Sequence, residues 1–419
     1  MRHPYYTINK LLPLVLASSC LSVVTVYAFR YIAYHPLYQH ISEFTYPFVP
    51  ALIATPILIA LFYFFAQHLK SGLPHVVLEF HIGLGRLPFS NFIFQFASAT
   101  ITLLMGFAVG AIGPAVHIGA SSANLVGQWF NVQSHALRIL TACGASVAIT
   151  IMLDTPLMAI LFTYETIIRQ FRWRTLTLVS ASTLFAQWFA HQMGIAPLSI
   201  EVQPFEFSAT LLGLLLIFGL LCGVISVSFL NGIDYLTKKI RITYWKKIIL
   251  AGMITAFFAS LSPNTVGLGH QLLDSLLYEE QVMNLLILWF FIRFISSMSV
   301  IALGIPGGAL GPSLILGALA GAIFSQFLSI DAGHLFIIIG MGAIFGAVLH
   351  VPLAGILFVL ESTNEILLLV PCLITSYCAY YFHQRYSRHN NLVELLLFRQ
   401  NVILRDSPSL KKKRLTSPL

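Results

Sequence analysis

The chain has 419 residues, of which 58% are hydrophobic and only 9% carry a charged side chain. A soluble domain usually has about a quarter charged residues, so this composition excludes an ordinary water-soluble protein and predicts a chain that crosses a membrane many times. The net charge of +8 does not indicate a nucleic-acid partner, because no aromatic-rich basic surface accompanies it.

Apolar segments long enough to cross a bilayer, which takes about 20 helical residues, occur along the whole chain. In chain order they are 11–29, 48–65, 211–230, 285–303 and 335–360. The last contains Gly and Pro and is too long for one straight span, so we expect two broken pieces. The first lacks a clear small-residue cleavage site, which favours a membrane span over a removed signal peptide.

Lysine and arginine gather in a few short stretches. The clusters are Lys70; Arg169, Arg172 and Arg174; Lys238, Lys239, Arg241, Lys246 and Lys247; and Lys411, Lys412, Lys413 and Arg414. The positive-inside rule places such clusters on the cytoplasmic face. We therefore expect two cytoplasmic termini and a basic cytoplasmic tail over 401–419. We interpret the tail as a topology signal; contact with anionic lipid is the alternative.

Three segments recur in the same order and at nearly the same spacing. Gly110-Ala-Ile-Gly-Pro114 recurs as Gly308-Ala-Leu-Gly-Pro312, 156–165 recurs as 352–361, and Gly72-Leu-Pro-His75 is echoed more weakly by Gly267-Leu-Gly-His270. Internal repeats of this kind predict one transmembrane domain, residues 1–419, built from two related halves, about 1–200 and 205–400.

Gly/Pro-interrupted segments in both halves are the best sequence pointer to a binding site near the membrane midplane. Proline in a first helical turn sacrifices no hydrogen bond, and glycine permits close approach. The unpaired N–H groups and the positive end of the helix dipole then favour an anion. The candidate anion-binding residues are Gly72, Gly110, Ala111, Ile112, Gly113, Gly308, Ala309 and Leu310. The alternative is that both motifs only kink spanning helices for packing.

Signals of other chemistry are weak. The five cysteines lie in apolar segments without ligand spacing, which predicts buried small side chains, no disulfide framework and no metal site. No GxSxG, HExxH or paired intramembrane aspartates appear, and Asp154 stands alone, so an intramembrane enzyme is not expected.

In order and spacing, Ser71-Gly-Leu-Pro74, Gly110–Pro114 and Gly308–Pro312 resemble the signature segments of the CLC chloride channels and chloride/proton antiporters, GSGIP, GK/REGP and GxFxP. The likeness runs from about residue 11 to 400. It implies an all-α polytopic membrane protein, an inverted repeat of tilted and half-spanning helices, and a homodimer with one pore per subunit. Chloride is the implied substrate, no cofactor is expected, and no cytoplasmic nucleotide-binding pair is expected after residue 400. A bacterial plasma membrane is the expected location.

Two departures from the family pattern concern protons. The resemblance implies a glutamate in the middle of GK/REGP that competes with the anion and carries a proton, but this chain has Ile112, which cannot ionise. Thr166 falls on the inner relay position and Glu165 on a structural glutamate repeated as Glu361. We therefore predict passive, proton-uncoupled chloride conduction. The alternatives are an antiporter with Glu165 or His117 as carrier, and a non-conducting scaffold or sensor.

Other family positions complete the candidate site. The serine of the first signature is Ser71, which implies a hydroxyl contact with the anion and a preference for chloride over nitrate; the alternative is an N-cap. The pore tyrosine falls near Leu392–Val393, so Val393 joins the site, with Tyr386 a weaker candidate. The Phe of GxFxP is Leu310.

One intramembrane cation has two interpretations. Arg293 lies in the apolar stretch before Gly304, and an intramembrane charge needs a partner or a wet cavity. We expect Arg293 to pair with Glu361, the alternative being added positive potential along the anion path.

Overall fold

The computed structural model describes residues 8–34, 46–65, 72–82, 85–195, 200, 202, 205, 207–328, 334–389 and 391–399, and over these residues every regular element is a helix. The elements up to residue 192 are α1 (Ile8–Ala33), α2 (Val49–Phe64), α3 (Gly72–His81), α4 (Phe89–Leu104), α5 (Ile112–Trp129), α6 (Ser134–Leu153), α7 (Pro156–Phe162), the π-helical η3 (Thr163–Ile168) and α8 (Trp173–Gln192).

The later elements follow the same sequence of long and short helices. They are α9 (Ala209–Lys239), α10 (Tyr244–Leu261), η4 (Pro263–Thr265), α11 (His270–Tyr278), α12 (Met283–Leu303), α13 (Leu310–Phe327), α14 (Leu335–Leu349), α15 (Pro352–Thr363), η5 (Ile366–Leu368), α16 (Leu369–Tyr386) and α17 (Leu392–Arg399). The all-helical class predicted from the sequence is therefore confirmed.

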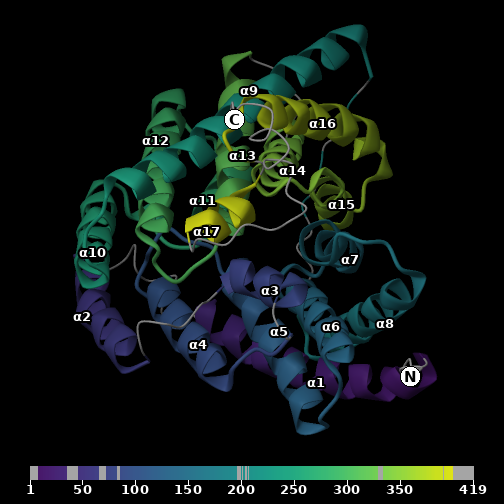
Figure 1. Cartoon of the computed structure of the whole chain (residues 1–419). Coiled ribbons are helices and arrows are strands. Elements are labelled where there is room, and N and C mark those ends of the chain that lie inside the picture. Colours follow the sequence, from purple (N-terminus) through teal and green to yellow (C-terminus); the bar gives the residue numbers. More distant parts are fainter. Residues whose placement is uncertain are drawn as a thin grey trace, which may run out of the picture.

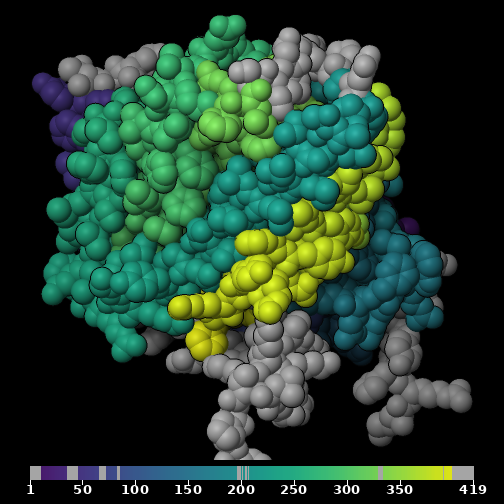
Figure 2. Space-filling view, turned by 90° about the horizontal axis from the view of Figure 1, so that it is seen from above, coloured from purple at the N-terminus to yellow at the C-terminus, as the bar shows by residue number. Residues whose placement is uncertain are grey.

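The two parts of the chain lie side by side, with purple and blue helices below and green and yellow helices above in Figure 1. Packing within them corresponds: α5 packs on α6 as α13 packs on α14, and α7 meets α15 where the two parts join. A second junction brings α10 against α2. Seen from above, yellow α16 runs diagonally beside teal α9 (Figure 2).

Seven helices among the described residues are long and apolar enough to cross a membrane: Leu11–Ala33, Ser134–Leu153, Ala209–Lys239, Tyr244–Leu261, Met283–Leu303, Leu310–Phe327 and Ile366–Tyr386. The predicted break within 335–360 is confirmed, since α14 ends at Leu349 and α15 begins at Pro352. Four of these seven helices were not predicted from the sequence: Ser134–Leu153, Tyr244–Leu261, Leu310–Phe327 and Ile366–Tyr386. Of these, Ser134–Leu153 is mostly buried, where small polar side chains bond within the protein.

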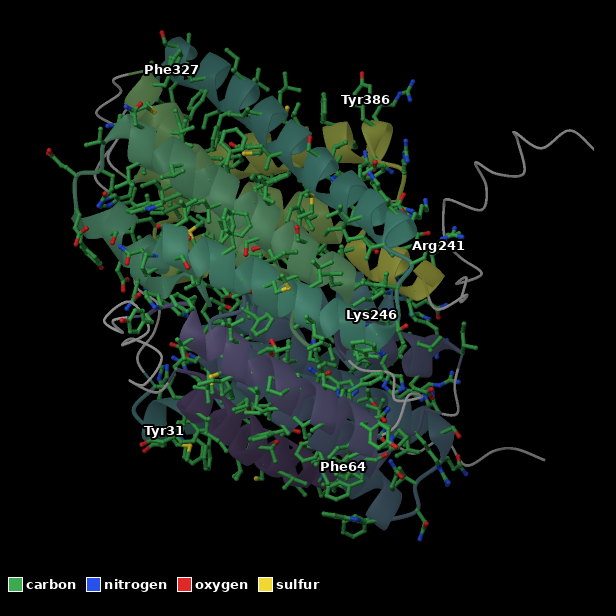
Figure 3. All side chains as sticks on the ribbon, turned by 90° about the vertical axis from the view of Figure 1, so that its left-hand side faces the viewer. Tyr31, Phe64, Arg241, Lys246, Phe327 and Tyr386 are labelled. Atoms are coloured by element: carbon green, nitrogen blue, oxygen red, sulfur yellow. The ribbon has the colours of Figure 1, made fainter. Side chains whose placement is uncertain are left out.

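The molecule has two ends in the direction along which most helices run. In Figure 3, Arg241, Lys246 and Tyr386 lie at one end, and Tyr31 and Phe327 lie at the other. Between these ends, large apolar side chains are exposed on the outer surface, among them Ile217 on α9 and Phe257 on α10. Such an apolar belt suits a lipid environment.

The glutamates repeated in the two halves each cap a helix of the other half. The Glu361 carboxylate on α15 accepts hydrogen bonds from the N–H groups of Leu157 and Met158 at 2.8 and 2.7 Å, at the start of α7. Glu165 on η3 accepts a hydrogen bond from the N–H of Ala354 at 3.0 Å, at the start of α15. Each carboxylate thereby occupies the positive end of a helix dipole.

The expected pair of Arg293 with Glu361 is therefore wrong. Arg293 is fully buried and donates hydrogen bonds to the carbonyls of Thr265 and Gly267 at 2.9 and 2.6 Å, and of Leu268 at 3.2 Å. These carbonyls belong to the turn before α11, where oxygens that no helix uses can bind the guanidinium. The arginine stabilises this turn and leaves Glu361 to the N–H groups of α7.

The expectation of buried cysteines holds for Cys143, Cys222 and Cys372 but is wrong for Cys20, which is exposed on α1, and Cys378 is intermediate. All five are free thiols. The outward face of α1 is apolar, so an exposed thiol there lies among side chains suited to lipid.

Candidate anion-binding site

The two GxxGP motifs meet backbone to backbone. Gly110 and Gly308 exchange two hydrogen bonds, with N···O distances of 2.6 and 2.8 Å, as an isolated antiparallel bridge. A Cβ atom on Gly110 would lie 2.6 Å from the backbone N of Gly311, and one on Gly113 would lie 2.9 Å from the Cα of Gly308. Only glycine permits this approach, so the repeated glycines join the two halves at one point.

Each motif begins a helix and does not kink a spanning one. α4 ends at Leu104 and α12 at Leu303, whereas α5 begins at Ile112 and α13 at Leu310. The N-cap residues are Ala111 and Ala309, whose methyl side chains cannot accept a hydrogen bond from the first turn. The interpretation of the motifs as mere kinks is therefore wrong, and the N–H groups of both first turns remain without a side-chain cap.

The start of α3 lies near the starts of α5 and α13. Gly72 has a φ of +76°, a left-handed conformation that favours glycine, and Pro74 follows in the first turn. This geometry turns the chain abruptly into the helix. The serine expected to cap it, Ser71, lies outside the described residues, so its place in the site stays a prediction.

These helix starts surround a cavity of about 300 Å³. It is lined by Gly72, Leu73, Pro74, Gln95, Gly113, Ile301, Gly304, Ile305, Pro306, Gly307, Gly308, Ala309, Leu310, Leu349, Leu392, Val393 and Leu396. The lining thus comes from the starts of α3, α5, α13 and α17, from the segment before α13, and from single residues of α4, α12 and α14.

Most of the predicted site residues reach this cavity. Gly72, Gly113, Gly308, Ala309, Leu310 and Val393 line it. Gly110, Ala111 and Ile112 are buried beside it without lining it: Gly110 pairs with Gly308, and Ile112 packs in the hydrophobic core. Tyr386 is exposed at the end of α16, so the weaker tyrosine candidate is not in the lining.

The polarity of the cavity comes from backbone groups and not from charged side chains. Among its described lining residues none ionises, and Gln95 carries the one polar side chain. Gln95 is 1% exposed and its Oε1 has no hydrogen-bond partner among the described atoms. Apolar walls lower the local dielectric, which strengthens the field of the helix starts on an anion inside.

The sequence also missed residues that complete the site. Gln95 sits on α4 outside every repeated motif, and Ile305 and Pro306 precede the second GxxGP motif. Thr102, two turns beyond Gln95 on α4, donates a hydrogen bond to the Pro306 carbonyl at 2.7 Å. The spacing of Asn91, Gln95, Ser98 and Thr102 marks one polar stripe on an otherwise apolar helix, and this signal could have identified α4 as facing the site.

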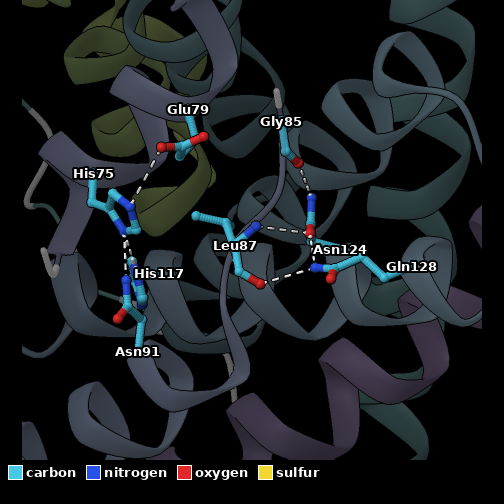
Figure 4. Close-up of polar contacts among 8 residues, drawn as sticks. All are labelled: His75, Glu79, Gly85, Leu87, Asn91, His117, Asn124 and Gln128. Atoms are coloured by element: carbon cyan, nitrogen blue, oxygen red, sulfur yellow. Dashed lines mark hydrogen bonds and ion pairs between the residues drawn. The ribbon is translucent and has the colours of Figure 1, made fainter. Parts of the chain in front are cut away.

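His117 is not the lone histidine that the sequence suggested. Its Nε2 lies 3.2 Å from Nδ1 of His75, and both rings are buried (Figure 4). Further along α5, Asn124 and Gln128 bind the backbone of Gly85 and Leu87 and hold this segment against the helix. The polar residues of α5 therefore form two groups, one at a histidine pair and one at a loop.

The fold and its cavity define an integral membrane protein in which paired half-helices from two halves meet at one point. The family described as Voltage gated chloride channel matches residues 51–384. The chain belongs to this family, the CLC family, whose description agrees with an ion-transport protein and not with an enzyme.

Two curated relatives are exchangers by name. The H(+)/Cl(-) exchange transporter ClcA of Yersinia pestis bv. Antiqua (strain Angola) is 30% identical over 304 residues, 67% of this chain and 62% of the relative. ClcA of Vibrio cholerae serotype O1 (strain ATCC 39541 / Classical Ogawa 395 / O395) is 30% identical over 302 residues, 67% of this chain and 63% of the relative. The chain thus spans less than two thirds of the length of these relatives.

Solved structures share the fold over nearly the whole chain. A slow cyanobacterial Cl-/H+ antiporter superposes with a TM-score of 0.82 at 19% identity, covering 96% of this chain and 98% of that one. A CLC-type fluoride/proton antiporter superposes with a TM-score of 0.80 at 20% identity, covering 92% and 98%. At these identities the likeness concerns the fold, which agrees with the predicted arrangement of tilted and half-spanning helices.

Proposed function

We propose that this chain conducts chloride and similar small anions passively across a membrane, without exchanging protons. The observation that carries the proposal is the cavity at the starts of α3, α5 and α13, whose described lining has backbone N–H groups and no ionisable side chain. Two of the three starts have alanine N-caps, so a mobile anion is the partner that their first turns lack.

The absence of proton exchange follows from the residue at one position. Coupling requires a group that binds a proton and blocks the anion path in turn. Ile112 stands where the family resemblance implies that carboxylate, and it packs in the core. Glu165, one of the two candidate substitutes, is bonded to the N–H of Ala354 and does not line the cavity. Both features favour an anion path without a tethered carboxylate.

Purified protein in liposomes tests the proposal. With an imposed chloride gradient, a potassium ionophore to balance charge and an external pH electrode, we expect chloride efflux without net proton movement above that of protein-free vesicles. Uphill proton movement driven by the chloride gradient would overturn the uncoupled function. Absence of chloride efflux from these liposomes would favour the alternative of a non-conducting scaffold or sensor.

The second candidate is chloride/proton antiport, which the names of both exchanger relatives favour. It requires a substitute proton carrier, Glu165 or His117. The same electrode measurement decides between the candidates. Replacing each residue by Gln then identifies the carrier, because only the variant of the true carrier loses proton movement while it keeps chloride flux.

Assembly and orientation are part of the proposal. We propose a homodimer with one cavity per subunit in the plasma membrane of a bacterium. The end of the molecule with Arg241 and Lys246 faces the cytoplasm by the positive-inside rule. We propose that both termini are cytoplasmic as well. Cross-linking in native membranes and accessibility of single introduced cysteines at the two ends test these points.

A further inference from the structure

Four polar side chains, none of which lines the cavity, form a cluster on the helices whose starts line it (Figure 4). His75 and Glu79 lie on α3, Asn91 on α4 and His117 on α5. Nδ1 of His75 lies 3.2 Å from Nε2 of His117 and 3.4 Å from Nδ2 of Asn91. Nε2 of His75 lies 3.8 Å from Oε1 of Glu79. The two imidazole rings and the amide are buried, whereas the Glu79 side chain is 22% exposed.

The contacts assign the protons of the neutral cluster. With the Asn91 amide oriented as in the structure, its nitrogen donates toward Nδ1 of His75, whose own proton then lies on Nε2, toward Glu79. Nε2 of His117, at 3.2 Å, is the nearer donor to the single lone pair of this Nδ1 atom, and the contact from Asn91 is the longer one. This leaves Nδ1 of His117 as a bare lone pair, buried and without a hydrogen-bond partner among the described residues. The cluster therefore has one vacant position for a proton.

The cluster is connected to the cavity by three helices. His75 follows Pro74, a lining residue at the start of α3, and His117 lies one turn after Gly113, a lining residue at the start of α5. Asn91 lies one turn from Gln95, the polar lining residue on α4. A change of charge in the cluster therefore occurs within about one helical turn of lining residues on all three helices, and its field reaches an anion in the cavity.

Few other charges face this cluster from the elements packed against α3 and α5. Helices α4 and α13 have no titratable or charged residue. The remaining neighbours contribute His81 on α3, Arg30 and the tyrosines of α1, His135, Arg138 and Cys143 on α6, Tyr164 and Glu165 on η3, and Glu394 on α17. Arg30 binds the carbonyls of Ile151 and Met152, and Glu165 binds Ala354, so both are committed elsewhere.

We propose that His117, His75 and Glu79 form a buried proton-binding site whose occupancy is linked to anion occupancy of the cavity. One proton from solution binds Nδ1 of His117, and no other bond is formed or broken. With Glu79 ionised, this proton brings the net charge of the cluster from −1 to zero. Repulsion of a cavity anion then falls, and by reciprocity a bound anion favours the proton. The inference deepens the proposed anion function and rests on it.

The site modulates anion binding without carrying protons across the membrane. Neither histidine lines the cavity, and proton binding to a fixed pair does not require access from both membrane faces. Passive conduction and this linkage are therefore compatible. A linked proton predicts tighter anion binding at low pH even in a protein that moves no protons.

Chloride titration calorimetry on purified protein in detergent tests the linkage. Between pH 7 and pH 4 we expect chloride affinity to rise, by up to the roughly 5-fold that marks the lower range of allosteric coupling. His117→Gln keeps a side-chain donor for His75 but cannot ionise, so its affinity should be the same at both values. His135→Gln, at an exposed histidine of α6, is the matched control and should keep the dependence. An unchanged pH dependence in His117→Gln, or none in the wild type, overturns the proposal.

A reciprocal measurement avoids variants that fail to fold. Adding chloride to the unmodified protein in weakly buffered detergent at pH 4.5 should take up a fraction of one proton per chain, seen as alkalinisation, whereas gluconate should not. No uptake on chloride binding overturns the linkage. If chloride does not bind at all, the proposed function fails first. Uphill proton movement in liposomes would overturn uncoupled conduction and leave the linkage standing.

Discussion

Two pairs of proline-containing helix starts meet at the junction of the halves. The pairs differ in what binds the N–H groups of their first turns. At α7 and α15 the first-turn N–H groups bind a glutamate from the opposite half, Glu361 or Glu165. At α5 and α13 the N-caps are Ala111 and Ala309, and no side chain caps either helix. A proline-containing helix start is therefore capped by a glutamate of the chain in one place and lines a cavity in the other.

The difference teaches what makes a helix start available to a ligand. A helix dipole attracts any nearby negative group, and a tethered carboxylate is always present at high local concentration. Where the chain supplies one, the start is satisfied and structural. Where it supplies alanine, glycine and isoleucine, the start is open to a mobile anion. Substitutions can disturb the glycine junction, remove a glutamate from a capped helix start, or add a carboxylate to an open one.

The largest effect is expected at the backbone crossing. Gly110→Ala places a methyl group 2.6 Å from the backbone N of Gly311, which cannot move aside as a side chain would. We expect a loss of about 3 kcal/mol or more in unfolding free energy. Gly213→Ala on α9, where nothing lies within 4 Å, is the control and should gain up to about 1 kcal/mol. Thermal unfolding in detergent measures both, and equal stability of the two variants would contradict the crossing.

Removing a tethered carboxylate should cause a smaller loss of unfolding free energy and should not change chloride flux. Glu361→Ala leaves the N–H groups of Leu157 and Met158 without their acceptor, so we expect a loss of about 2 kcal/mol. Glu365→Ala, at an exposed glutamate nearby, should change little. The folded fraction of Glu361→Ala should conduct chloride at the wild-type rate per molecule. A selective loss of flux at unchanged stability would place Glu361 in the anion path.

Adding a tethered carboxylate should close the open helix start. Ile112→Glu introduces a competitor for the anion at α5, so we expect about tenfold slower chloride flux near neutral pH, a difference of about 1.4 kcal/mol. Protonation removes the negative charge, so the flux should rise as pH falls. Ile112→Gln has the same length without a charge and should keep the pH dependence of the wild type. Liposome flux between pH 7.5 and 4.5 compares the variants, and a rise in Ile112→Glu no steeper than that in Ile112→Gln would contradict the competition.

The smallest effect concerns selectivity at the start of α3. If the hydroxyl of Ser71 contacts the anion, as the family resemblance implies, Ser71→Pro should shift preference from chloride toward nitrate several-fold at similar total flux. Ser71→Ala, which also lacks the hydroxyl but keeps an ordinary backbone, separates loss of the ligand from the effect of proline. Anion-substitution flux assays measure the ratio, and unchanged relative permeabilities would remove Ser71 from the site.

Much of the fold and part of the site could be predicted from residue patterns. Low charge and long apolar runs indicated membrane helices, and Gly/Pro placement located the starts of α3, α5 and α13 and the break before Pro352. These features are local: a glycine at positive φ or a proline in a first turn acts through its own backbone. Four spans, among them Ser134–Leu153, were not predicted although their own residues are apolar enough to cross a membrane, so this omission has no tertiary cause.

Partners distant in sequence were predicted less well. The match between Glu165 and Glu361 indicated a shared structural role, and both accept hydrogen bonds from backbone N–H groups, but Glu361 does not pair with Arg293 as expected. His117 appeared isolated because His75 lies on another helix. A hydrogen bond depends on atomic positions within a few tenths of an ångström, and sequence spacing fixes such positions only within one element.

The sequence by itself determined that this is a helical membrane protein with repeated glycine–proline helix starts, because composition and backbone preferences act without reference to the rest of the chain. Only the tertiary structure decided which starts receive a glutamate and which surround a cavity, and that two histidines on α3 and α5 meet. The physical reason is that the field of a helix start extends over one turn, so its partner is whatever folding brings within a few ångströms.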